Sequence, residues 1–152
     1  MNFLNYEITK NLKSIKDGMD IALCAIDFKK MELQYAGANN PVYIIRNSEF
    51  IELKADKQAI GSDSIDAEEK IFTNQVVQLQ KGDSIYLFTD GYADQFGGPN
   101  GKKFKYKMFR NILLEIESHK MSEQKELLNK HFEHWRGGLE LVDDILVIGI
   151  RV

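Results

Sequence analysis

Two apolar segments of this chain, far apart in the sequence, each carry a carboxylate at one end. The first segment, residues 85–91, reads Ile-Tyr-Leu-Phe-Thr-Asp-Gly and ends in a turn at Asp90. The second segment, residues 142–150, has Asp143 near its start and continues as an apolar run. In an antiparallel pair, the C-terminal end of one strand lies beside the N-terminal start of its neighbour. If the two segments form such a pair, Asp90 and Asp143 share one edge of a sheet.

Carboxylates that share an edge repel one another unless a positive charge compensates them, and a hard divalent cation is a common solution. Neither segment contains Cys or His, so the donors favour Mg²⁺ or Mn²⁺ over Zn²⁺. Gly91 allows a sharp turn directly after Asp90 and leaves space beside a metal free of a Cβ atom. The alternative is that Asp90-Gly91 is an ordinary turn and Asp143-Asp144 an exposed strand entry. The residues leave both interpretations open.

The composition excludes several classes of protein. A chain of 152 residues is long enough for one domain with its own core. Its net charge of −3 provides no basic field for nucleic acid or an anionic membrane, so we expect contact with neither. No apolar run approaches the roughly 18 residues of a membrane span, and no signal-peptide pattern is present. The single cysteine, Cys24, fits a reducing compartment, and we expect the protein to be cytoplasmic.

The hydrophobic periodicity predicts a helix over residues 1–16, then five or six strands in hairpins, two helices and a final strand. The segment 21–26 is apolar on both faces, which predicts a central strand. The remaining strands are predicted at 31–35, 42–45, 50–53, 71–79 and 84–89, and the last two form a hairpin through residues 81–83. A long loop is predicted over 55–69. The helices follow a glycine-rich loop at 96–101; one carries its apolar face from Phe104 to Ile116, and the other starts near Ser122 and stops at Gly137. This grouping predicts an α+β fold with a largely antiparallel sheet covered by helices.

Three further candidates have simple structural interpretations. Lys102 and Lys103 follow the glycine-rich loop and could meet a phosphate, although an exposed connector is the favoured interpretation. His131 and His134 are three residues apart on a predicted helix, but no third metal ligand is evident nearby. Cys24 lies among apolar neighbours and is expected to be a core residue.

Five motifs in this order resemble the SpoIIE/RsbU-type branch of the metal-dependent serine/threonine protein phosphatases. The motifs are Asp17-Gly18-Met19-Asp20, Tyr35-Ala36-Gly37-Ala38-Asn39-Asn40-Pro41, Lys81-Gly82-Asp83, Thr89-Asp90-Gly91 and Asp143-Asp144-Ile145. The resemblance covers nearly the whole chain, residues 1–152, which we interpret as a single partial phosphatase domain, about its C-terminal two-thirds.

The resemblance implies an α-β-β-α sandwich with two Mn²⁺ or Mg²⁺ ions in the intact domain, and hydrolysis of phosphoserine or phosphothreonine by metal-activated water. It makes Asp90 and Asp143 metal ligands. Gly91 and Asp144 would contact these ligands and orient them, without binding the metal themselves. It also implies a phosphorylated anti-anti-sigma-type regulator as substrate and a sensory domain upstream in the parent protein.

The chain departs from the family pattern in two places. The Gly-Asp and Asp-Gly-x-Gly motifs that the family places before the first helix are not found, and Asn39 and Asn40 stand where relatives often carry a His. We therefore expect an N-terminally truncated domain that is inactive alone. An unpaired sheet edge would follow, and we expect a homodimer. The alternative function is a non-catalytic phosphatase-like module for binding or dimerisation.

Overall fold

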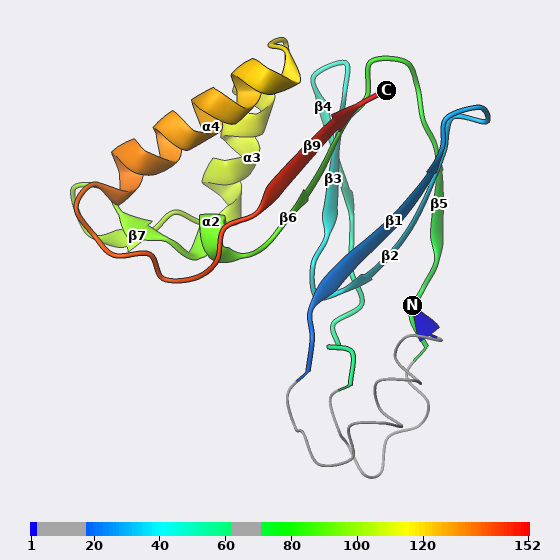
Figure 1. Ribbon diagram of the computed structural model, residues 1–152, viewed down its shortest axis with the longest axis horizontal. Coiled ribbons are helices and arrows are strands. Elements are labelled where there is room, and N and C mark those ends of the chain that lie inside the picture. Colours follow the sequence, from blue (N-terminus) through cyan, green and yellow to red (C-terminus); the bar gives the residue numbers. More distant parts are fainter. Residues whose placement is uncertain (3–17, 62–70) are drawn as a thin grey trace. The chain divides into compact units, whose positions relative to one another are not determined.

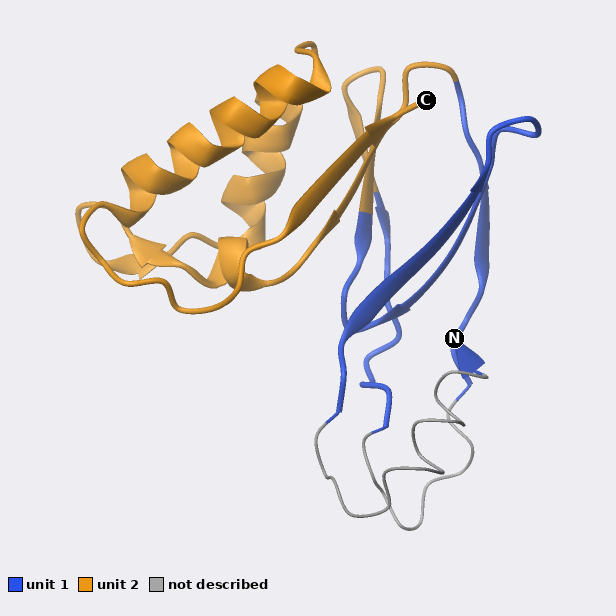
Figure 2. Ribbon diagram, viewed as in Figure 1, with its two compact units in different colours: residues 1–42, 52–80 blue, residues 43–51, 81–152 orange. Residues whose placement is uncertain are grey.

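The structure is a computed structural model that describes residues 1–2, 18–61 and 71–152 (Figure 1). Residues 3–16 of the predicted N-terminal helix and most of the loop predicted over 55–69 lie outside these ranges. The described residues form two compact units, residues 1–42 with 52–80 and residues 43–51 with 81–152 (Figure 2). Within the described ranges, no helix is long and apolar enough to cross a bilayer.

The first unit contains an antiparallel sheet of three strands in the order β1-β2-β5. They are β1 (Ile21–Asp27), β2 (Glu32–Ala38) and β5 (Gln75–Gln78). The prediction that residues 21–26 form a central strand is wrong, because β1 lies at the end of this sheet and pairs with β2 alone among the described strands. Burial alternates along most of β1, as expected where one face of a strand is less covered than the other, and Leu23 is 45% exposed. Cys24, expected in the core, is only half-buried.

The motif at residues 35–41 folds back on itself at the end of β2. The Tyr35 hydroxyl donates a hydrogen bond to the Asn40 carbonyl at 2.8 Å. A Cβ atom on Gly37 would lie 1.9 Å from that hydroxyl, so only glycine leaves room for the ring. Asn39, in the left-handed region with a φ of 58°, donates from its side chain to Asp20 Oδ1 at 2.7 Å. The motifs at 17–20 and 35–41 therefore meet within the first unit.

The second sheet has four strands in the order β4-β3-β6-β9. They are β4 (Glu49–Leu53), β3 (Val42–Arg46), β6 (Ser84–Phe88) and β9 (Val147–Arg151). The predicted hairpin of 71–79 with 84–89 is wrong: β5 pairs with β2, whereas β6 lies between β3 and β9. The turn at 81–83 is held instead by the second unit. Arg46 donates two hydrogen bonds to the buried Asp83 carboxylate, at 2.9 and 2.7 Å, and the Val152 amide donates to the Asp83 carbonyl at 3.0 Å.

The helices of the second unit pack through an aromatic core. The unit contains α2 (Gly91–Asp94), the short hairpin of β7 (Phe96–Gly97) with β8 (Lys102–Lys103), α3 (Tyr106–Ile116) and α4 (Met121–Arg136). Both long helices lie where the periodicity predicts them. Gly137 caps the C-terminus of α4, and its φ of 59° favours glycine. The buried rings that join helices to strands are those of Tyr43, Phe88, Tyr92, Phe104, Phe109 and Phe132. The predicted α+β class with antiparallel sheets is confirmed.

Candidate metal centre

The candidate site is built where β6 ends and β9 begins. These strands pair antiparallel, with Phe88 opposite Val147 as the last pair of the ladder. The predicted pairing of the two acidic segments is therefore confirmed. One detail differs: β9 starts at Val147, so Asp143 and Asp144 lie in the loop before the strand and do not open the strand itself.

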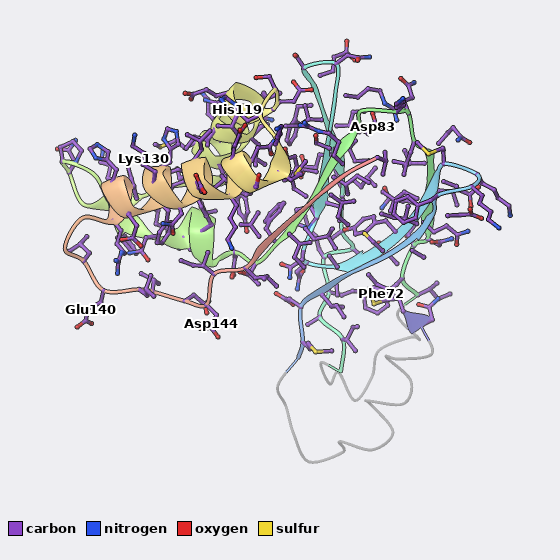
Figure 3. The ribbon with its side chains drawn as sticks, turned by 45° about the horizontal axis from the view of Figure 1, so that its top comes forward. Phe72, Asp83, His119, Lys130, Glu140 and Asp144 are labelled. Carbon is purple, nitrogen blue, oxygen red and sulfur yellow. The ribbon has the colours of Figure 1, made fainter. Side chains whose placement is uncertain are left out.

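Thr89 joins the two segments beyond the end of the ladder. Its side-chain hydroxyl donates to the Asp144 carbonyl at 2.8 Å and accepts from the Leu146 amide at 3.0 Å. Its own amide donates to the Leu146 carbonyl at 3.0 Å. Figure 3 shows Asp144 on the loop that leads from α4 to β9. Asp90 directly follows Thr89 and Asp143 directly precedes Asp144, so these bonds bring the two acid-bearing segments together.

Gly91 makes the close approach possible. A Cβ atom at this position would lie 2.5 Å from the Asp144 carbonyl oxygen and 3.2 Å from a side-chain carbon of Ile145. Any larger residue would push the loop away from α2. From the sequence, the missing Cβ of Gly91 was expected to leave space beside a metal. In the structure, the backbone of Asp144 occupies the space that a Cβ atom would fill.

Asp90 and Asp143 both present exposed carboxylates. Asp90 precedes α2, and its backbone carbonyl accepts from the Asp94 amide at 2.9 Å. The Asp143 carboxylate accepts from the Asp144 amide at 2.7 Å, which fixes one of its oxygens against the loop. The other oxygen of Asp143 accepts no hydrogen bond from the described residues and can donate an electron pair to a cation.

These donors fit a hard divalent cation. Mg²⁺ is commonly held in proteins by one or two carboxylates, with water and substrate phosphate completing its octahedron. Mn²⁺ accepts the same oxygen ligands. Over residues 1–2, 18–61 and 71–152, no group of three or more His, Cys, Asp or Glu side chains is placed to hold a metal. Neither His131 and His134 nor Asp90 and Asp143 therefore belong to such a group in these ranges, and Asp90 with Asp143 stays the pair predicted from the sequence.

The loop before Asp143 is held by a residue that the sequence interpretation did not single out. Gln95 is 0% exposed, and its side-chain amide donates to the Glu140 carbonyl at 2.9 Å. Its side-chain oxygen accepts from the Val142 amide at 3.3 Å. The partners are backbone atoms, so no residue pattern could have revealed them.

The two lysines of the glycine-rich segment have separate environments. Lys103 donates to the Asp94 carboxylate at 2.9 Å and lies over the ring of Phe96. Lys102 is exposed. The segment is a short hairpin whose Gly97 packs against the backbone of Trp135, so it is an ordered connector.

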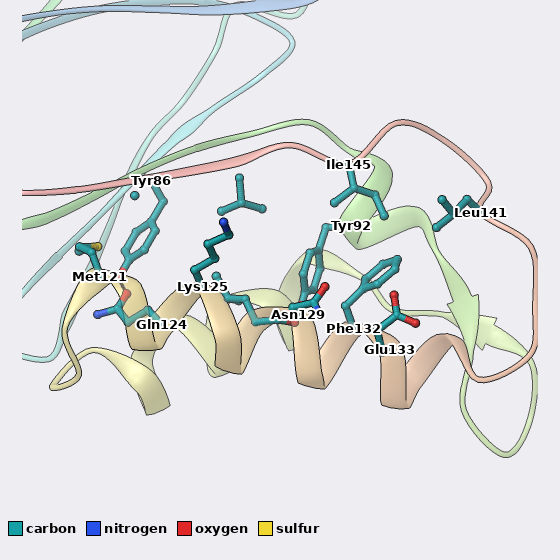
Figure 4. A pocket seen from close by; sticks show the side chains of 13 residues that line it. Tyr86, Tyr92, Met121, Gln124, Lys125, Asn129, Phe132, Glu133, Leu141 and Ile145 are labelled. Atoms are coloured by element: carbon teal, nitrogen blue, oxygen red, sulfur yellow. Dashed lines mark hydrogen bonds between the residues drawn. The ribbon is translucent and has the colours of Figure 1, made fainter.

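A groove of about 490 Å³ lies between α4 and β9 (Figure 4). Tyr86 and Gln124 lie at one end, where the tyrosine hydroxyl donates to the amide oxygen at 2.7 Å, and Leu141 lies at the other. Burial raises the pKa of Tyr92, whose hydroxyl donates to the Leu128 carbonyl at 2.8 Å. Neither Asp90 nor Asp143 lines this groove.

The chain is similar to proteins of known family and fold. The family model described as stage II sporulation protein E (SpoIIE) matches residues 1–152. The SiaA-PP2C domain of Pseudomonas aeruginosa is similar, with 28% identity and a TM-score of 0.88; the match covers 97% of this chain and 57% of that one. No curated protein matches.

Two more distant structures share the fold. The phosphatase domain of SpoIIE from Bacillus subtilis, presoaked with Mn, is 19% identical with a TM-score of 0.65, over 95% of this chain and 59% of that one. The RsbU and RsbW domains of a Mycobacterium tuberculosis protein are 18% identical with a TM-score of 0.68, over 94% of this chain and 39% of that one.

The chain thus spans less than two-thirds of the length of each of these structures. The matches confirm the predicted fold class, that of the metal-dependent phosphatases with largely antiparallel sheets. Because the family model extends over all 152 residues, this chain belongs to the SpoIIE family, within the SpoIIE/RsbU-type branch of the metal-dependent protein phosphatases.

Proposed function

We propose that this chain is the C-terminal part of a serine/threonine phosphoprotein phosphatase domain from a cytoplasmic signalling protein of bacteria. Asp90 and Asp143 bind Mn²⁺ or Mg²⁺, and the parent protein hydrolyses phosphoserine or phosphothreonine. The observation that carries the proposal is the hydrogen bonding of Thr89 to Asp144 and Leu146, which holds the two acid-bearing segments together. Membership of the SpoIIE family supports the reaction class.

The residues of the chain have distinct parts in this function. Asp90 and Asp143 supply anionic oxygen donors from two different segments, one at the end of β6 and one before β9. Gly91 lets these segments approach, and Asp144 is the backbone partner that fixes their spacing. Asp90 and Asp143 would help to hold the divalent ions, two of them in the intact domain, which would supply activation of water and compensation of charge on the phosphoryl oxygens.

The proposed substrate is a phosphorylated regulatory protein of the anti-anti-sigma type, with a sensory domain upstream in the parent. This part of the proposal is supported by the similar structures from proteins of bacterial regulation, one of which holds an RsbU domain together with an RsbW domain.

The test is Mn²⁺-dependent release of phosphate from phosphoserine and phosphothreonine peptides by the parent protein. Asp90→Asn keeps the size of the side chain and removes its charge, so turnover should be lost. Asp94→Asn is the matched control, because Asp94 lies four residues after Asp90, at the end of α2, but pairs with Lys103. Unchanged turnover in Asp90→Asn would contradict the proposal. We expect the 152-residue chain alone to show little turnover.

One observation favours a second function, that of a non-catalytic module for binding or dimerisation. In the described part of the chain, the candidate centre has two carboxylates, without a third group beside them. A parent protein that binds its phosphorylated partner but releases no phosphate with either Mn²⁺ or Mg²⁺ would support this alternative.

We also propose that the chain self-associates as a homodimer. β9 is the last strand of its sheet among the described strands, and Leu146 and Ile148 are 52% and 44% exposed on or beside it. An open strand edge with exposed apolar side chains favours pairing with another chain. Light scattering over a range of concentrations should give the dimer mass, and a monomer at high concentration would refute this proposal.

A further inference from the structure

The loop that carries Asp143 is held on both sides by side chains from one short stretch of the chain. Residues 140–142 precede Asp143, and residues 144–146 follow it. Gln95 binds the backbone before Asp143, and Thr89 binds the backbone after it. Thr89 and Gln95 also flank α2, the helix that Asp90 precedes. The two acid-bearing segments are therefore joined at two points, one on each side of Asp143.

Gln95 is well suited to hold a loop in one position. Its side chain is fully buried, and its amide donates to two carbonyls, those of Phe96 at 3.1 Å and Glu140 at 2.9 Å. Its side-chain oxygen accepts from the Val142 amide. A buried amide that satisfies both its donor and acceptor sides in this way fixes the groups it binds, because breaking any bond leaves a polar atom unpaired in the core.

The backbone of Gln95 is itself fixed, so the glutamine can serve as an anchor. Its carbonyl accepts from the indole nitrogen of Trp135 at 3.2 Å and from the Phe104 amide at 2.9 Å. Trp135 in turn packs edge to face against Phe104, with ring centroids 5.3 Å apart. The loop before Asp143 is thus tied through Gln95 to the aromatic core.

We propose that Gln95 and Thr89 form a two-point clamp that positions Asp143 beside Asp90 for divalent-cation binding. Both are positioning residues, since each acts through the backbone on either side of Asp143. The expected effect of the clamp, tighter metal binding, rests on the proposed function. The restraint of the loop itself is inferred from the hydrogen bonds alone and does not depend on metal binding. Side chains that orient metal ligands are commonly worth about 10- to 100-fold in metal affinity.

The test uses four variants of the 152-residue chain and two measurements. Gln95→Met and Thr89→Val each remove hydrogen bonds while keeping the size of the side chain. Thr89→Ser retains the hydroxyl and should restore wild-type behaviour. Gln124→Met is the matched control. Gln124 is also buried, and its amide also donates to two backbone carbonyls, those of Glu117 and His119 between α3 and α4.

The first measurement is amide hydrogen exchange without metal. We expect faster exchange at Val142 in Gln95→Met and at Leu146 in Thr89→Val, with no change at either amide in Gln124→Met. The second is the Kd for Mn²⁺ by calorimetry. We expect binding about 10- to 100-fold weaker in Gln95→Met and Thr89→Val, and within about twofold of wild type in Thr89→Ser and Gln124→Met.

The outcomes separate the clamp from the proposed function. Unchanged exchange at Val142 and Leu146 in their respective variants would overturn the clamp. So would Mn²⁺ affinity that is unchanged in both, or reduced equally in Gln124→Met, which would indicate a general loss of stability. A wild-type chain that binds no Mn²⁺ would instead count against Asp90 and Asp143 as ligands, and the exchange data would still decide whether the clamp exists.

Discussion

Replacing Gly91 with alanine tests the junction between the two acidic segments. The added Cβ would lie 2.5 Å from the Asp144 carbonyl oxygen, whereas ordinary contacts of a Cβ begin at 3.4 Å. The loop or α2 must therefore move by about 0.9 Å. The obstacle is a backbone carbonyl held by Thr89, so a side-chain rotation cannot relieve the clash.

The cost can be worked from these contacts. Overpacking a close contact costs about 1–3 kcal/mol. If the shift also breaks the bond between Thr89 and the Asp144 carbonyl, about 1 kcal/mol is added. We therefore expect Gly91→Ala to lower the free energy of unfolding by about 2–4 kcal/mol. The φ of Gly91 lies outside the positive range, so the loss would come from the contact and not from backbone strain.

Urea unfolding followed by the fluorescence of Trp135 measures this effect, since the single tryptophan lies in the same unit as Gly91. Gly138→Ala is the matched control, because a Cβ there meets nothing within 4 Å and its φ is not positive. That variant should match wild type or gain up to about 1 kcal/mol. If Gly91→Ala were as stable as Gly138→Ala, the close approach of α2 to the loop would be refuted.

Two further predictions concern groups outside the candidate centre. Asp83→Ala removes the buried carboxylate that receives two hydrogen bonds from Arg46, and it should cost about 3 kcal/mol in urea unfolding; a cost below about 1 kcal/mol would contradict the role of this pair in anchoring the turn at 81–83. Burial raises the pKa of the Cys24 thiol from 9.0 to about 11, so its alkylation by iodoacetamide at pH 9 should be more than tenfold slower in the folded chain than in urea. Because the folded state holds this proton more tightly, the thiol's contribution to stability is complete below pH 9 and is lost as the pH rises toward 11. Equal alkylation rates in the two states would refute the burial of Cys24.

The sequence was sufficient to predict the features that depend on local pattern. The apolar runs before Asp90 and after Asp143 predicted paired strands, and β6 and β9 pair as expected. Turn chemistry was less informative. Lys81-Gly82-Asp83 has the composition of a hairpin turn, but Asp83 is bound by Arg46 of β3, and the chain changes sheets at this point.

The start of the last strand could not be predicted for a similar reason. The residues from Asp143 to Leu146 have the composition of a strand entry. The Thr89 hydroxyl, however, binds the Asp144 carbonyl and the Leu146 amide, and β9 begins at Val147. Gln95 was missed because its partners are backbone groups 45 and 47 residues away, which leave no signature in residue types.

The central claim is that Asp90 and Asp143 bind one divalent cation together. Its most direct test is Mn²⁺ titration of the 152-residue chain by calorimetry, beside Asp90→Asn, Asp143→Asn and the control Asp94→Asn. If the two carboxylates form one site, the wild type and the control bind Mn²⁺ saturably, and binding is lost in both of the other variants. Binding that persists in Asp90→Asn or Asp143→Asn, or a wild type that binds no Mn²⁺, would contradict it.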